Sequence, residues 1–368
     1  MNKRRKPKKW RVLVIILILL AIFVGTVLLL TYPRTPAITD SQGKKIQGSI
    51  AKLEKVKIGG VDQWILMRGI NTANPILLFL HGGPGFSEME LFGHFNAELQ
   101  KHFVVVNWDQ RGAGKSYSSK IANSRLTIEQ FVSDAHEVVE YLKSKFEKDK
   151  IYLVGHSWGS LLGMLIIFRY PESFYAYVGI GQCSNMPEGE RVSYEYTLKM
   201  AKKRNNQKAV KELEDIGFPV NGIYKDGFSG TITQRKWLIK FGGSLYGKNS
   251  WNPFIKRILL TKEYSLIDRI NFFKIANMPS KIEMMENEVL RMNLLEQIPE
   301  VKIPIYFFLG RHDYEVPAVV AEKYFEIIKA PKKELIWFEK SAHFPCFEEA
   351  DKFNRLIEEK VLAETYRK

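Results

Sequence analysis

Cysteine is scarce in this chain of 368 residues, and the scarcity excludes one class of protein. The two cysteines, Cys183 and Cys346, cannot build the disulfide framework of a small stapled domain. We therefore expect two unpaired thiols, and cysteine usage does not identify the redox compartment. Internal repeats and low-complexity tracts are also missing. The hydrophobic fraction of 45% and the charged fraction of 26% are those of a globular protein with a sizeable core.

Sequence patterns that bind nucleic acids or nucleotides are missing as well. The formal net charge is +15, but part of it comes from the N-terminal tail and the rest is spread along the chain without a dominant block. No module combines basic with aromatic residues, so we predict a solvated basic surface near anionic lipid and no nucleic-acid partner. The glycine-rich stretches have neither dinucleotide-binding nor Walker spacing.

One long apolar run is present, near the N-terminus. Val12 to Leu30 is almost purely aliphatic, and as a helix it would span about 28 Å, close to the hydrocarbon thickness of a bilayer. Basic residues crowd the segment before it. We predict a basic cytoplasmic tail (1–11), a transmembrane helix (12–32) that makes the lipid bilayer a partner, and a linker (33–49). By the positive-inside rule, the protein is a single-pass membrane protein with its catalytic part outside the cytoplasm.

A cleaved signal peptide is the competing interpretation of this run. Signal peptides have a shorter apolar region, of 7–15 residues, followed by a cleavage site with small side chains. The best candidate site, Thr35-Pro-Ala37, contains a proline and is therefore poor.

Strand and helix patterns alternate through most of the remaining chain. A hairpin is expected over Leu53–Ile58 and Gln63–Gly69, and apolar runs typical of buried parallel strands follow it. These runs are Pro75–Leu80, Phe103–Trp108, Ile151–Val154, Tyr175–Ile180, Ile303–Leu309 and Glu334–Phe338. The pattern predicts an α/β fold with a doubly wound, mostly parallel sheet. Residues 50–183 and 300–368 would form its core, and residues 184–299, which lack such strands, an inserted helical cap.

The strand at Ile151 ends in Gly155-His-Ser-Trp-Gly159, and a helix follows. This is the G-x-S-x-G pattern of a nucleophile elbow, in which Ser157 sits on a sharp strand-to-helix turn. Its neighbours two positions before and after must lack side chains. The turn aims the hydroxyl at the helix N-terminus, where backbone N–H groups can hold an oxyanion.

Serine needs a base to take its proton, and the base needs an orienting acid. Functional groups gather at the carboxyl ends of parallel strands, so we searched the two later strand ends. His343 follows the last strand and is the expected base, and Asp313 follows the strand before it and is the expected acid. Glu315 is the alternative acid, although it lies farther from the strand end.

A glycine loop, His81-Gly-Gly-Pro-Gly85, follows the strand at Pro75–Leu80. Glycines let backbone N–H groups approach a substrate carbonyl without obstruction. We predict an oxyanion hole made by the N–H groups of Gly83 and Trp158, with Gly82 as the alternative first donor. No metal ligand set and no cofactor are expected. His81 is expected to brace the glycine loop, and His156 is expected to pack beside the nucleophile or line the pocket and not to act as the base.

Three motifs together resemble the proline iminopeptidase group of α/β-hydrolases. They are the glycine loop, Asp109-Gln-Arg-Gly-Ala-Gly-Lys-Ser116 and Gly155-His-Ser-Trp-Gly-Ser160. The resemblance covers about residues 50–182 and 300–363, and it implies a Ser-Asp-His hydrolase with a helical cap. Proline iminopeptidases hold the free amine of a peptide with acidic cap residues. By that resemblance, the candidate amine ligands are Glu188, Glu190 and Glu195, and a solvated helix face is the alternative account of these three carboxylates. The tryptophan-glutamate motif of those enzymes has no evident counterpart in the cap, and residues 184–300 are net positive.

The expected activity is therefore hydrolysis of an amide or ester bond in a small molecule or short peptide, most like an aminopeptidase of the proline iminopeptidase type. A carboxylesterase or lipase-like enzyme is the alternative. A non-catalytic binding protein on the same fold is a further alternative, which the presence of all three triad residues disfavours. The sequence gives no information on oligomeric state.

Overall fold

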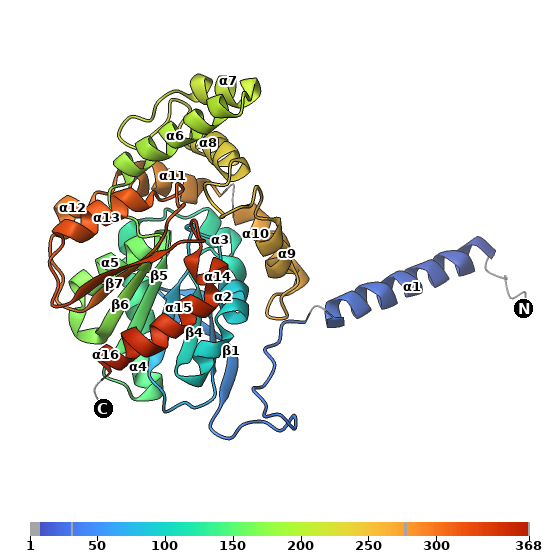
Figure 1. The fold of residues 1–368 in the computed structure, drawn as a ribbon. Coiled ribbons are helices and arrows are strands. Elements are labelled where there is room, and N and C mark those ends of the chain that lie inside the picture. Colours follow the sequence, from blue (N-terminus) through green and yellow to red (C-terminus); the bar gives the residue numbers. More distant parts are fainter. Residues whose placement is uncertain (1–7, 31, 276–277, 367–368) are drawn as a thin grey trace, which may run out of the picture.

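The computed structural model describes residues 8–30, 32–275 and 278–366, and it is built around one twisted sheet with helices on both faces (Figure 1). The described strands run in the sheet order β1-β2-β4-β3-β5-β6-β7-β8. Their bounds are β1 Ile50–Ile58, β2 Val61–Gly69, β3 Ile76–Leu80, β4 Val104–Asp109, β5 Ile151–His156, β6 Phe174–Ile180, β7 Ile305–Gly310 and β8 Lys333–Phe338.

The sheet is mostly parallel, as the sequence predicts. β1 and β2 form the expected antiparallel hairpin, and β2 also pairs antiparallel with β4. Every other pairing, from β4–β3 through to β7–β8, is parallel. The carboxyl ends of β3, β5, β7 and β8 therefore meet at one edge of the sheet, and the chain segments that leave this edge carry the predicted site.

Helices cover the sheet and fill the segment between β6 and β7. Before β7 the helices are α1 Lys8–Leu30, α2 Met89–Phe95, α3 Ser119–Ala122, α4 Ile128–Phe146, α5 Trp158–Arg169, α6 Met186–Lys203, α7 Gln207–Ile216, α8 Phe228–Lys240, α9 Asn252–Leu259, α10 Leu266–Ile275, α11 Pro279–Asn287 and α12 Leu294–Gln297. After β7 they are α13 Ala318–Ile327, α14 Pro345–Glu348, α15 Ala350–Leu356 and α16 Ala363–Thr365. Short 3₁₀ turns are η1 Ala97–Lys101, η2 Gly114–Ser116, η3 Pro171–Ser173 and η4 Val289–Arg291, and Ile357–Leu362 is π-helical.

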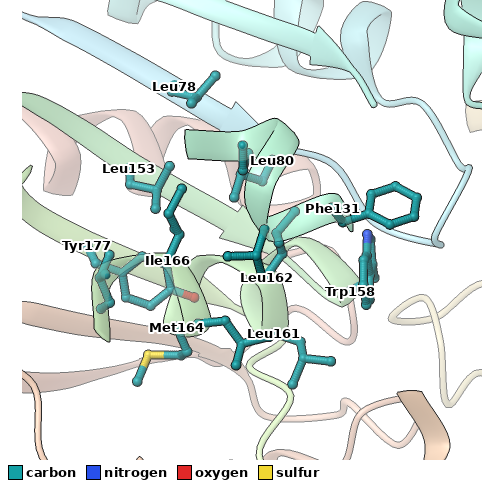
Figure 2. Packing of buried hydrophobic residues seen from close by; sticks show 14 of the residues in the cluster. Leu78, Leu80, Phe131, Leu153, Trp158, Leu161, Leu162, Met164, Ile166 and Tyr177 are labelled. Atoms are coloured by element: carbon teal, nitrogen blue, oxygen red, sulfur yellow. The ribbon is translucent and has the colours of Figure 1, made fainter. Parts of the chain in front are cut away.

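Two apolar layers sandwich the sheet. One layer packs α4, α5 and α13 against one face, and the other packs α2, α14 and α15 against the opposite face. Figure 2 shows the first layer, where residues of α5 meet side chains of β3 and β5 and the indole of Trp158 lies near Phe131. Because α5 is apolar on nearly all sides and buried, its N-terminal end at Ser157 is fixed relative to the sheet.

The segment between β6 and β7 is helical and adds no strand to the sheet among the described residues. Its helices α6, α7 and α8 share a small apolar cluster of their own. These helices lie beyond the edge of the sheet in Figure 1, and α9 and α10 run along the side of the domain. The segment is therefore placed to contribute walls to a site at that edge.

Helix α1 is the one described helix that is long and apolar enough to cross a membrane. Its candidate span is Lys9–Val27, with a mean hydropathy of 2.7 and no buried residues in the window. A helix of this kind near an N-terminus fits either a membrane span or a signal sequence. Most of the predicted cytoplasmic tail, residues 1–7, and Thr31 in the predicted span lie outside the described residues.

Two helical segments are interrupted in the structure. The segment that begins at Met89 breaks where α2 ends at Phe95, and a 3₁₀ turn follows. At the break, the side-chain amide of Asn96 donates to the Cys346 carbonyl and to Asn354, more than 200 residues away in sequence. The last helical segment is split, because the π-helical stretch lies between α15 and α16. The Asn96 contacts are tertiary and leave no trace in the local sequence pattern.

Candidate active site

Ser157 lies on the turn between β5 and α5 with a backbone conformation that L-residues rarely adopt, φ 54° and ψ −122°. The two flanking glycines are sterically required. A Cβ atom at Gly155 would lie 2.3 Å from the Gly159 carbonyl oxygen, and one at Gly159 would lie 2.1 Å from the Leu80 carbonyl oxygen. The elbow is thus pressed against β3, and only glycine fits at either position.

Two side chains that the sequence analysis did not single out hold this turn. The hydroxyl of Ser160 donates to the Ser157 carbonyl oxygen at 2.6 Å and accepts from the Cys183 N–H at 2.9 Å. The Cys183 thiol, buried and unpaired, also lies 3.3 Å from the Ser157 carbonyl oxygen. Ser160 is one residue past the G-x-S-x-G pattern, whereas nothing in the sequence near Cys183 indicates its place under the elbow.

Asp313 and His343 meet at the same edge. His343 Nδ1 lies 2.9 Å from Asp313 Oδ2, and both residues are almost fully buried. The other carboxylate oxygen, Oδ1, accepts from the N–H groups of Glu315 and Val316, at 2.9 and 3.0 Å. The Glu315 carboxylate accepts instead from the Ser244 hydroxyl. The structure therefore pairs the histidine with Asp313 and not with the alternative acid.

Opposing effects act on the pKa of His343. Burial lowers it, but the carboxylates of Asp313, Glu315 and Glu88 raise it, and the balance brings the pKa to about 9. The carboxylates therefore stabilise the imidazolium form of His343. A general base is in this form after it has taken a proton.

The glycine loop after β3 passes directly over the nucleophile. A Cβ atom on Gly82 would lie 3.3 Å from Ser157 Cβ. The Gly82 N–H is already donated to Glu88 Oε2 at 3.1 Å. The N–H groups of Gly83 and Trp158 have no protein acceptor among the described residues. This difference favours Gly83 over Gly82 as an oxyanion donor.

A buried network joins the glycine loop to the Asp109–Ser116 motif. His81 Nε2 accepts from the Gln110 N–H at 3.1 Å, and His81 Nδ1 lies 2.8 Å from the Gly82 carbonyl oxygen. The Gln110 side chain then accepts from the indole N–H of Trp158 at 2.8 Å. Burial lowers the pKa of His81 to about 4, so the ring stays neutral and braces the loop.

His156, next to the nucleophile, points away from it and ties two loops together. Its Nδ1 lies 2.8 Å from Glu88 Oε1, and its Nε2 lies 2.8 Å from the His343 carbonyl oxygen. The ring therefore bridges a buried carboxylate on one side and a backbone carbonyl on the other. Because Glu88 also holds the Gly82 N–H, this pair connects the glycine loop to the loop of the base.

Glu88→Ala is expected to lower the free energy of unfolding by about 3–5 kcal/mol, because it breaks a buried pair and leaves both His156 Nδ1 and the Gly82 N–H without their carboxylate partner. Chemical denaturation of the detergent-solubilised protein measures this. Glu98→Ala is the matched control, since that carboxylate is 67% exposed and its loss changes stability by less than about 0.5 kcal/mol. Equal effects of the two variants would show that the pair has no structural role.

A cavity of about 350 Å³ opens above Ser157, between the glycine loop and the helical segment. Most of its wall is aromatic or aliphatic, and the side chains that give it this character are Phe86, Phe228, Trp251, Ile255, Phe272, Phe273, Ile275, Met285 and Phe344. Three charged residues also line it: Glu88, Glu315 and Lys281. Burial lowers the pKa of Lys281 to about 8.

The three carboxylates predicted to bind an amine are not among the residues that line this cavity. Glu188 and Glu195 both pair with Arg191 on the surface of α6. Glu190 is buried, but it pairs with Arg235 and accepts from the Tyr224 hydroxyl at 3.2 Å. Their charges are therefore already compensated inside the helical segment. The sequence analysis did not identify Glu88 as a cavity residue, and it considered Glu315 only as an acid.

Comparison with known proteins agrees with this architecture. The family model described as the alpha/beta hydrolase fold matches residues 75–350. The chain belongs to this family. It is 33% identical over 305 residues to the "Probable aminopeptidase YbaC" of Bacillus subtilis, an alignment that covers 83% of this chain and 94% of that protein. It is 27% identical over 310 residues to a proline iminopeptidase of Saccharolobus solfataricus, covering 82% of this chain and 90% of that protein.

Solved structures show the same fold at lower identity. The proline iminopeptidase of Mycobacterium smegmatis matches with a TM-score of 0.60 and 18% identity, covering 85% of this α/β-hydrolase and 98% of that chain. A bacterial membrane phospholipase A also matches with a TM-score of 0.60, at 16% identity, covering 95% of this chain and 97% of that one. Together with the relatives named aminopeptidase and proline iminopeptidase, the fold identifies the protein as a serine hydrolase related to these enzymes.

Proposed function

We propose that this hydrolase cleaves an amide or ester bond through Ser157, Asp313 and His343 and an acyl-enzyme intermediate. The observation that carries the proposal is the buried 2.9 Å contact between His343 and Asp313 at the sheet edge that also presents the strained Ser157 elbow. His343 takes the proton of Ser157 as the hydroxyl attacks the carbonyl carbon. The same proton then goes to the leaving group, and His343 next activates water to release the acyl group.

The negative charge of the tetrahedral intermediate would rest on the N–H groups of Gly83 and Trp158. Both groups lack a protein acceptor among the described residues, and Trp158 begins α5, so the helix dipole adds to the stabilisation. Asp313 holds the ring of His343 in the correct tautomer and stabilises its charged form. Residues of α8 to α11 line the cavity, which supports a capping role for the inserted helices.

Within this chemistry, an aminopeptidase of the proline iminopeptidase type is the leading proposal. It is supported by the relatives of that name and by the position of Glu315, a cavity carboxylate that could face a substrate amine. The test is turnover of prolyl arylamides by the purified protein. Turnover of these amides above that of the Ser157→Ala variant supports the proposal, and complete absence of such turnover by a protein that cleaves esters would overturn it.

A carboxylesterase is the second candidate, and a specific observation favours it. The cavity wall is dominated by aromatic and aliphatic side chains, and the carboxylates predicted to hold an amine lie elsewhere. Short acyl esters of 4-nitrophenol, assayed in parallel with the arylamides, distinguish the two candidates. If neither substrate is turned over and no active-serine probe reacts with the folded protein, a non-catalytic binding role follows.

The pH dependence of activity and that of stability are expected to run in opposite directions. Attack by Ser157 needs neutral His343, so kcat/KM is expected to rise with pH and level off near the raised pKa of about 9. The folded pKa of His343 exceeds its unfolded value of about 6.5. Its contribution to stability is therefore fully present below about pH 6.5 and is lost as the pH rises through about 9.

Initial rates and thermal unfolding, measured over the same pH range, check both trends. A rate profile that levels off below pH 7 would contradict the raised pKa of the base.

The membrane part of the proposal is that α1 spans the bilayer with its N-terminus in the cytoplasm and the catalytic domain outside. The exposed apolar surface of α1 and the basic residues before it support this orientation. Protease added to spheroplasts that carry the full-length protein tests it. Digestion of the domain without lysis is expected, whereas digestion only after lysis would reverse the orientation.

A further inference from the structure

An exposed apolar surface lies on α10 and the turn before it. We call it the α10 face, and its residues and exposed fractions are Leu260 66%, Leu266 38%, Ile267 63%, Ile270 49% and Phe273 55%. Single exposed apolar side chains are common on protein surfaces, but five within fourteen residues form a patch that needs a partner. The opposite side of α10 is also apolar, since Phe272 and Ile275 are buried and line the cavity.

Polar contacts fix helix α10 and the turn before it to the domain. Asp268, on α10, pairs with the buried Lys115 at 2.8 Å, and the Tyr264 hydroxyl just before the helix lies 3.0 Å from both carboxylate oxygens of Asp109. Arg269 donates to the Thr261 carbonyl oxygen at 2.8 Å, which closes the turn. The polar side chains of this segment therefore contact the domain, whereas the apolar residues of the α10 face remain exposed.

The chain that leaves α1 contacts this same turn. The Arg34 N–H donates to the Lys262 carbonyl oxygen at 2.9 Å, only four residues beyond the end of α1 at Leu30. Figure 1 shows α9 and α10 on the side of the domain nearest α1, and α13 on the opposite side. If α1 spans a bilayer, the α10 face lies where that bilayer begins.

Charge around the patch fits an anionic lipid surface. Exposed lysines surround the apolar residues: Lys256, Lys262 and Lys274. Two acidic residues of this region add little exposed negative charge, because Asp268 is paired with Lys115 and Glu263 is buried, where it accepts from the Thr261 hydroxyl. An apolar centre with a basic rim is the pattern by which helices lie in the headgroup region of a membrane.

We propose that the α10 face docks onto the bilayer that holds α1, with Leu266, Ile267 and Ile270 among the acyl chains and the lysines at the headgroups. The proposal rests on the proposed membrane span of α1. It places one wall of the reaction cavity beside the lipid, because Phe273 lines the cavity above Ser157 and also an open groove with Ile270 and Met278. An amphipathic substrate dissolved in the bilayer would then enter the cavity past Phe273.

The experiment uses the full chain in phosphatidylcholine vesicles, with and without phosphatidylglycerol. Nitroxide labels are attached singly to Ile267→Cys, Ile270→Cys and, as a matched control, Ile327→Cys, which is 54% exposed at the end of α13. A label at Leu17→Cys, on α1, reports whether α1 lies in the bilayer. Cys183 and Cys346 are buried, and the unsubstituted chain corrects for any label that they take up. Power saturation then compares collisions with oxygen and with a water-soluble nickel complex.

Labels at positions 267 and 270 are expected to collide more with oxygen than with nickel, most strongly in vesicles containing phosphatidylglycerol, while position 327 shows the reverse. If the label at position 17 lies in lipid but the labels at 267 and 270 are as water-exposed as the label at 327, the docking proposal is wrong and the membrane span of α1 is supported. If position 17 is also water-exposed, the anchor and the docking both fail. Spectral broadening between labels at position 267 would instead assign the face to a second copy of the chain.

Discussion

Ser157→Ala is expected to lower kcat by on the order of 10⁴–10⁶ while leaving the fold intact. The large loss follows because the serine hydroxyl is the proposed nucleophile, and no neighbouring side chain can replace it. Stability is expected to stay within about 0.5 kcal/mol of the parent, because the structural contacts of this residue run through its backbone. Initial rates and thermal unfolding of the purified protein measure the two quantities.

Ser229→Ala is the matched control for this variant, because that serine lies exposed on α8, away from the elbow. Its activity should match the parent. A Ser157→Ala protein that is folded and retains more than about a tenth of the parent activity would show that another residue attacks the substrate.

Asp313→Asn is expected to lower kcat by about 10⁴ because an amide cannot hold His343 in the required tautomer. The pH midpoint of the remaining activity should also fall, since Asp313 is the carboxylate that contributes most to the raised pKa of His343. A merely structural effect of the substitution would lower the rate without moving this midpoint. Rates across the pH range, for parent and variant, provide the measurement.

Glu315→Gln distinguishes the two acids that the sequence offers. Glu315 lines the cavity and accepts from the Ser244 hydroxyl, but its carboxylate makes no hydrogen bond to His343 among the described residues. We expect its substitution to lower turnover of short acyl esters, which carry no amine, by less than about tenfold, the effect of one altered hydrogen bond. If Glu315→Gln is as damaging as Asp313→Asn toward these esters, the assignment of the acid is wrong.

The sequence predicts the sheet well because its strands are short apolar runs that end in turn residues. The runs before His81, Ser157, Asp313 and His343 all appear as parallel strands, and their carboxyl ends meet at one edge. From this arrangement the sequence also predicts that Asp313 and His343 approach each other, and the structure brings them to 2.9 Å. Asp313 and His343 each follow one of two neighbouring parallel strands, β7 and β8. Because parallel strands place their carboxyl ends at the same edge of the sheet, the two residues lie close together.

The walls of the cavity are much harder to predict. Glu190 looks like a free carboxylate in the sequence, but its partner Arg235 lies 45 residues away on another helix. Glu88 looks like the first residue of a surface helix, yet it is buried against His156 and Gly82. Such pairings depend on how helices of the inserted segment and the loops pack together. Local periodicity carries no information about them.

The central claim is that Ser157 is an activated nucleophile, and one measurement tests it most directly. The full-length protein is treated with a fluorophosphonate probe, digested, and the peptide that carries the adduct is sequenced by mass spectrometry. We predict a single adduct on Ser157, and none when the protein is treated at a pH well below the pKa of His343. An adduct on a different serine, or none at any pH on folded protein, would contradict the account.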